Sequence, residues 1–286
     1  MSTTHLPAGP EGLGIVLGAD ATPSEDGWLV RELVVPPGLD GPPGILQGGL
    51  AAGLAIPVAQ AVDPHGAPVT GVDARLHAPT PLGRRLAARV RGAEAAARYE
   101  VEVRDDDRLL VSAEVELAGR DPASQAYDLL ELAQVPLPRS RPQHVYPTCV
   151  VCGPEPTHPH GQRLHPAWHA PDQVVVPWVC DDALGDERGA VDVLMVSAVL
   201  DCPTVWASME AIDAAGYEVA LLAGYHLRFF HDAPVMAPLR TVARFDGLDG
   251  RKVSARGALV DEDGVVYALS SALHVAANDA PPVTAG

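Results

Sequence analysis

Residues 45–62 read ILQGGLAAGLAIPVAQAV, and the fold expected for the first half of the chain follows from this segment. Leucine or valine recurs at every fourth position, which is the spacing of residues on one face of a helix. The rest of the stretch is almost entirely apolar, so we expect a helix that is buried on most sides. Gly48 and Gly49 lie at its start, and Pro57 is expected to bend it because proline has no amide hydrogen.

Strand candidates follow this helix and recur later in the chain. Apolar runs bounded by turn residues predict strands at about 28–35, 69–78, 84–92, 97–104 and 109–118, and again at about 174–179, 219–230, 239–246, 251–260 and 265–276. A second long apolar helix is predicted over 191–212, with an interruption at Pro203. Both parts of the chain therefore have the same order of elements: a strand, a long helix and four strands.

Short motifs also repeat at a nearly constant offset. GVDAR at 71–75 matches GYHLR at 224–228, and Pro57 in the first helix matches Pro203 in the second. We therefore expect an α+β fold built as a tandem duplication, each half an antiparallel sheet wrapped around a central long helix. The expected organisation is a mostly irregular leader (1–25), a first unit (26–119), a linker with a short helix at 127–133 (120–147), and a second unit (148–278).

Composition limits the classes of partner and the compartment. The 286 residues carry a formal net charge of −17 and are 47% hydrophobic, so a core is expected, while binding to nucleic acid or to an anionic membrane is not. Four cysteines are too few for a disulfide scaffold, which favours a reducing compartment, the cytoplasm. The N-terminus lacks the features of a signal peptide, and no unbroken run of about 18 apolar residues predicts a membrane span.

Motifs in the second half resemble a known family. CVVCGP (149–154), PW (177–178), LDCP (200–203) and VWA (205–207) are similar to those of bacterial double-hotdog proteins related to acyl-CoA thioesterases. The resemblance covers roughly residues 28–276. It implies a tandem hotdog fold and hydrolysis of an acyl thioester carried by coenzyme A or by an acyl carrier protein.

The first helix departs from that family's usual pattern. Phenylacetate-type thioesterases have His-Gly-Gly where this chain has Gln47, Gly48 and Gly49, and an acid further along the helix where this chain has Ala55 or Ile56. The first half thus lacks the acid, and the second half lacks the glycine pair. Since the resemblance implies that hotdog active sites draw on opposite subunits, we expect one composite site between the two halves of this chain.

Thioester hydrolysis needs donors for the developing oxyanion and a base or nucleophile that brings in water. Free N–H groups at a glycine-rich helix start can supply the donors, so Gly48 and Gly49 are assigned that role. Asp201 is assigned as general base or nucleophile, and Gln47 as the residue that positions substrate or water.

Each of these residues also has a structural alternative. Asp201, two residues before Pro203, has the chemistry of a helix N-cap. Gln47 could be a loop residue that satisfies backbone groups, and the pair Gly48-Gly49 could allow close packing of the helix on the sheet.

Further residues are expected to hold the substrate. The acyl chain is predicted to lie between the two helices. Cationic side chains are expected to bind the phosphates of coenzyme A or an acidic carrier protein. The alternative is that these cationic side chains are solvated charges at the edges of the sheet. The candidate substrate-binding residues are Leu46, Leu50, Val205, Trp206, Tyr225, Arg84 and Arg251.

A cysteine pair lies outside this scheme. Cys149 and Cys152, with His158 and His160 shortly after them, have the ligand types of a zinc site. Paired buried thiols and a redox pair are the alternatives, and paired thiols are favoured because the histidine spacing is shorter than usual. No cofactor is therefore expected.

Two rival functions remain open. A hotdog hydratase or dehydratase acts on the same class of thioester, but such enzymes typically need an Asp–His pair, often with an asparagine, and Asn278 at the tail is the only asparagine. A non-catalytic binder of acyl-CoA or of a carrier protein is the second rival. The oligomeric state expected is a monomer or a homodimer.

Overall fold

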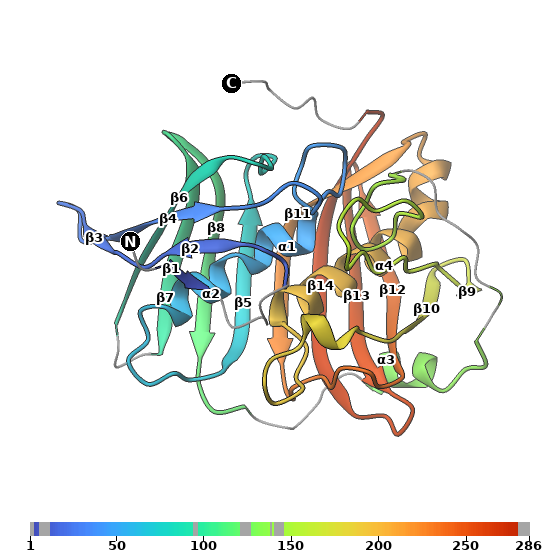
Figure 1. Ribbon diagram of the computed structural model, residues 1–286. Coiled ribbons are helices and arrows are strands. Elements are labelled where there is room, and N and C mark those ends of the chain that lie inside the picture. The colour runs from blue at the N-terminus through green and yellow to red at the C-terminus, as the bar shows by residue number, and fades with distance from the viewer. Residues whose placement is uncertain are drawn as a thin grey trace.

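The computed structural model describes residues 3–5, 12–93, 97–120, 127–137, 139 and 146–279. Within these ranges the strands form one antiparallel sheet of 14 strands, with the main helices packed on one face (Figure 1). The first half contributes β4 (Leu29–Val34), α1 (Gly48–Gly53), α2 (Ala55–Gln60), β5 (Val69–Leu76), β6 (Arg85–Ala93), β7 (Arg98–Asp105) and β8 (Arg108–Leu117). The second half contributes β10 (Gln173–Trp178), α4 (Val193–Ala214), β11 (Val219–Phe229), β12 (Leu239–Asp249), β13 (Lys252–Asp261) and β14 (Val266–Ala277).

The duplication predicted from the sequence is visible in the strand order. The first half runs β4-β6-β7-β8-β5, and the second continues β11-β14-β13-β12-β10, so every strand has a counterpart at the mirrored position. At the seam β5 pairs with β11, with Gly71 opposite Arg228 and Arg75 opposite Gly224. The repeated motif therefore pairs with its own copy across a pseudo-two-fold axis. This confirms the predicted α+β tandem architecture.

The first helix is short and broken. Gln47 caps α1, because its side chain accepts a hydrogen bond from the Leu50 N–H. The helix is interrupted at Leu54, between α1 and α2. Pro57 explains the break, because it has no N–H to offer the Gly53 carbonyl four residues earlier and its ring crowds that carbonyl.

The second helix is long and continuous. α4 runs for 22 residues with Pro203 inside it, and Asp192 caps it by accepting from the Leu194 N–H. The predicted interruption at Pro203 is therefore wrong. One proline removes a single hydrogen bond, and packing of α4 on β12 and β13 holds the turns on both sides of it in place.

Helix α4 also passes a length and composition test for a membrane-spanning helix, with a mean hydropathy of 1.2 over its best window. The sequence criterion of about 18 consecutive apolar residues does not detect this helix, because Asp201 interrupts its apolar run. Of that window, 72% is buried inside the protein, which is typical of a helix in a protein core.

The segments outside the two units also contain strands and a helix among their described residues. Residues 1–25, predicted to be mostly irregular, contribute three short strands: β1 (Thr3–His5), β2 (Val16–Gly18) and β3 (Thr22–Pro23). β2 extends the sheet by pairing with β4. The predicted linker contains α3 (Tyr127–Ala133), and a short strand, β9 (Trp168–Ala170), lies at the other edge of the sheet. Residues 1–2, 6–11, 121–126, 138 and 140–145 of the predicted leader and linker lie outside the described residues.

Candidate active site

Asp201 is the centre of a hydrogen-bonded group built by both halves. It lies in the middle of α4 and is only 6% exposed. Its Oδ2 accepts a hydrogen bond from Gln47 Nε2 at 2.7 Å and another from the Gly49 N–H at 2.9 Å. Its Oδ1 lies 3.2 Å from His274 Nε2. The N-cap interpretation of Asp201 is wrong, because Asp192 occupies that position nine residues earlier.

Gln47 is held at both ends of its amide. Its Oε1 accepts from the Leu50 N–H at 2.9 Å, and its Nε2 donates to Asp201. Nε2 also lies 3.4 Å from the Ala198 carbonyl oxygen and 3.7 Å from Cys202 Sγ. The side chain thus satisfies a backbone group, as the structural alternative expects, and at the same time contacts the acid.

The two glycines allow α1 and α4 to approach each other closely. A Cβ on Gly49 would lie 2.4 Å from the carbonyl oxygen of Ser197, and a Cβ on Gly48 would lie 2.8 Å from Asp201 Oδ2. The close packing at Gly49 is therefore helix against helix, not helix against sheet. The Gly49 N–H donates to Asp201, so it is not free for an oxyanion and that part of the prediction is wrong, whereas Gly48 lines the neighbouring pocket.

His274 is a partner of Asp201 that the motifs did not reveal. It lies on β14, is fully buried, and is not among the residues that line the pocket. Its Nδ1 is buried and has no hydrogen-bond partner within the described residues. A signal for this residue exists in the sequence, because His274 occupies an inward-facing position of an alternating strand, where a polar side chain is unusual.

A pocket of about 320 Å³ opens beside Asp201. Both halves line it, mostly with apolar side chains such as Ile45, Leu46, Leu76, Val205, Trp206 and Met209. The polar lining includes Gln47, Asp201 and Thr80, whose buried hydroxyl has no partner within the described part of the chain. The arrangement is an apolar cavity with a carboxylate in its wall, which suits a ligand with an apolar chain and one polar group.

Three of the predicted substrate-binding residues line this pocket: Leu46, Val205 and Trp206. The structure places Leu50 and Tyr225 in the core instead, both fully buried and outside the lining. The Tyr225 hydroxyl donates to the Ser197 carbonyl at 3.1 Å, and burial raises the pKa of this phenol. Its role here is therefore to fix α4 on β11.

The two predicted cationic residues lie away from the pocket and have protein partners. Arg84 forms an ion pair with Asp105 at 2.9 Å, and Arg251 donates from Nε to the Ala276 carbonyl at 2.8 Å. Neither residue is among those that line the pocket, so the geometry favours the structural interpretation of both arginines.

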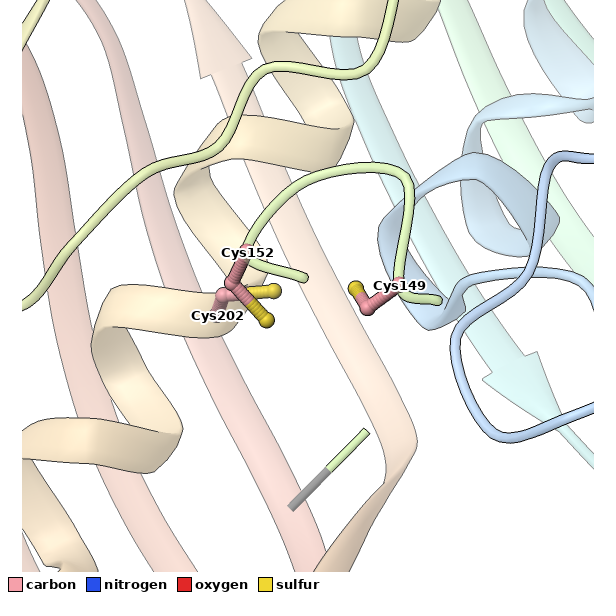
Figure 2. A group of neighbouring side chains, drawn as sticks. All are labelled: Cys149, Cys152 and Cys202. Carbon is pink, nitrogen blue, oxygen red and sulfur yellow. The ribbon is translucent and has the colours of Figure 1, made fainter. Parts of the chain in front are cut away.

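The cysteine pair is joined by a third cysteine. The sulfurs of Cys149, Cys152 and Cys202 all lie within 4.8 Å of one another, and Figure 2 shows them converging from a loop and from α4. His158 and His160, predicted as possible co-ligands, are not part of this group. Their rings lie 5.6 Å apart, and the His160 N–H donates to His158 Nδ1 at 3.2 Å.

No protein-family model and no curated protein matches the chain. Solved structures do match it over almost its full length. An acyl-CoA thioesterase II, TesB2, from Mycobacterium marinum superposes with a TM-score of 0.57 at 12% identity, covering 90% of this chain and 96% of that chain.

Two further structures extend the comparison. The dehydratase domain of a mycocerosic acid synthase-like polyketide synthase superposes with a TM-score of 0.61 at 17% identity, covering 98% of each chain. A conserved protein of unknown function with the hot dog fold, from Alicyclobacillus acidocaldarius, superposes with a TM-score of 0.60 at 14% identity, covering 92% of this chain and 97% of that chain. At such identities the likeness establishes the fold alone: the chain is a double hotdog, with two copies of the unit in one polypeptide.

Proposed function

We propose that this protein hydrolyses an acyl thioester, carried by coenzyme A or by an acyl carrier protein, at one site between its two halves. One observation carries the proposal: the carboxylate of Asp201, from the second half, is hydrogen-bonded by Gln47 and Gly49 of the first half beside an apolar pocket. The acyl-CoA thioesterase II among the structural neighbours supports the same class of reaction.

In the proposed reaction Asp201 removes a proton from a water molecule, and the resulting hydroxide attacks the carbonyl carbon of the thioester. The carbon–sulfur bond then breaks, and the thiolate leaves and takes up the proton. The N–H of Gly48, at the start of α1, and the Thr80 hydroxyl are the pocket-lining donors proposed for the oxyanion. Gln47 and His274 act as positioning residues that fix the carboxylate.

The test is a thiol-release assay on a panel of acyl-CoA esters of increasing chain length. We expect turnover in the wild type, and a loss of about 100- to 10,000-fold in Asp201→Asn. Asp192→Asn is the matched control, because it makes the same chemical change on the same helix at a residue outside the pocket lining. Folding of both variants is checked by circular dichroism. A folded Asp201→Asn protein with unchanged turnover would contradict the assignment.

A dehydratase or hydratase is the second candidate, because Asp201 and His274 form the Asp–His pair that the sequence motifs did not contain. The dehydratase domain among the neighbours has the same fold. His274 is buried behind Asp201, away from the pocket, which favours hydrolysis. Conversion of a 3-hydroxyacyl thioester to the conjugated enoyl thioester, without release of thiol, would identify a dehydratase. Saturable thermal stabilisation by acyl-CoA without either reaction would identify a binder.

A further inference from the structure

The three clustered cysteines come from two segments that are distant in sequence. Cys149 and Cys152 lie on a tight loop, and Cys202 lies on α4, one residue after Asp201 (Figure 2). All three are buried and free of disulfide bonds. All three also line the pocket, so the cluster shares a wall with the proposed site.

The loop is built to bring its two sulfurs to the same side. The Gly153 N–H donates to the Cys149 carbonyl at 2.8 Å, which closes a turn around the two cysteines. Gly153 is required there, because a Cβ would lie 2.2 Å from the Pro147 carbonyl oxygen. The Val150 N–H donates to the Asp40 carbonyl at 2.7 Å and ties the loop to the first half.

One polar donor from the first half also contacts the cluster. Gln47 Nε2, 3.7 Å from Cys202 Sγ, adds an N–H donor of the kind that surrounds metal-bound sulfur.

We propose that Cys149, Cys152 and Cys202 form a zinc-binding site that fastens the 146–153 loop to α4, with its fourth coordination position facing the pocket. Zinc–sulfur bonds of about 2.3 Å place tetrahedral sulfurs about 3.8 Å apart, so sulfurs already within 4.8 Å need only small side-chain rotations. Three protein ligands leave one position, which water or a polar group of a ligand in the pocket fills.

The test measures metal in the full-length chain, purified without chelators or metal-affinity resin. We expect about one zinc per chain by elemental analysis, and a sulfur-to-cobalt charge-transfer band after replacement with Co²⁺. Cys202→Ser is expected to weaken zinc binding by more than about 100-fold. Cys180→Ser, which removes a buried thiol outside the cluster, is expected to bind zinc like the wild type.

Two results would overturn the proposal. If the wild-type protein contains no zinc and all four thiols react after unfolding, the cluster consists of plain buried thiols. If it contains no zinc and only two thiols react after unfolding, two of the cysteines form a disulfide. If Cys202→Ser does not fold, metal-free wild-type protein is titrated with Co²⁺ instead. Absence of the sulfur-to-cobalt charge-transfer band would then contradict metal binding by the thiolates. None of these measurements depends on thioester hydrolysis, so failure of the zinc proposal can be distinguished from failure of the proposed function.

Discussion

The two central helices occupy equivalent places in the duplicated fold, yet they differ in length, polarity and contacts. The first, α1 with α2, is short, broken and free of charged side chains, and it contributes a capped glycine-rich start. The second, α4, is a continuous helix with Asp201 at its middle. We infer from this difference that each copy contributes a different part of the proposed site. The glycine start and the acid meet only because the helices pack side by side at the pseudo-two-fold axis.

The largest expected effect comes from restoring the acid to the first helix. Ala55 is equivalent to Asp201, is fully buried, and lies on the helix that packs against β7 and β8. The residues of α4 that correspond to Gly48 and Gly49 are apolar, so a carboxylate at position 55 would have no comparable hydrogen-bond donors. We expect Ala55→Asp to lower the free energy of unfolding by about 4 kcal/mol without adding turnover.

Urea unfolding of Ala55→Asp and of the uncharged Ala55→Asn at neutral pH separates the effect of charge from that of size. A stable Ala55→Asp protein with twice the wild-type rate of thiol release would show that the halves are interchangeable, and the division between them would then be wrong.

A smaller effect is expected from crowding the contact between the helices. Gly49→Ala places a methyl group 2.4 Å from the Ser197 carbonyl oxygen and 2.9 Å from the Ala198 Cα, both backbone atoms of α4. The helices must separate, so we expect a loss of about 2 kcal/mol in stability. We also expect a roughly 100-fold loss of thiol release, because Asp201 loses its donor geometry.

Gly119→Ala is the matched control, because no atom lies within 4 Å of a Cβ at that position. Thermal unfolding and thiol-release rates of the two variants are compared. Equal behaviour of both would show that the close approach of α1 and α4 is not needed for the site.

The smallest effect concerns the cap of α4. Burial raises the pKa of Asp192 from 3.8 to about 6. Between these values the folded protein keeps a proton that the unfolded chain has lost, so stability falls as pH rises from about 4 to about 6. Asn also caps helices well, so Asp192→Asn is expected to raise stability above pH 6, where the folded protein carries the buried charge. The expected gain is only about 1 kcal/mol, because the partly exposed carboxylate is also screened by water. Near pH 4 the carboxyl is protonated in the folded protein, and the substitution is expected to change stability little. Urea unfolding at several pH values checks this, and a gain independent of pH would contradict the assignment.

Much of the fold was predictable from local patterns. The apolar spacing of 45–62, the alternating strands and the repeat of GVDAR as GYHLR predicted the paired architecture, and α3 begins and ends where expected. Predictions from single residues were less successful. Pro203 does not break α4, because packing on the sheet outweighs the loss of one hydrogen bond, and Asp201 is not a cap.

The candidate site was predictable only in part. The pairing of Asp201 with Gln47 and Gly49 agrees with the inference that each half had lost one component. The places of His274 and Cys202 do not follow from the motifs, because His274 is 73 residues from Asp201 along the chain, and Cys202 is 50 and 53 residues from its partners Cys152 and Cys149. For the same reason the sequence offers only the nearby His158 and His160 as possible co-ligands of the cysteine pair, whereas the structure brings Cys202 to it.

The amino-acid order specifies which segments become helices and strands and that the unit occurs twice, since these follow from the spacing of apolar residues and the placement of glycine and proline. Which polar atoms meet is a consequence of packing. The distance between the carboxylate of Asp201 and the start of α1 depends on how closely two helices can approach across a pseudo-two-fold axis, and that is set by backbone contacts at Gly49 that no local pattern contains.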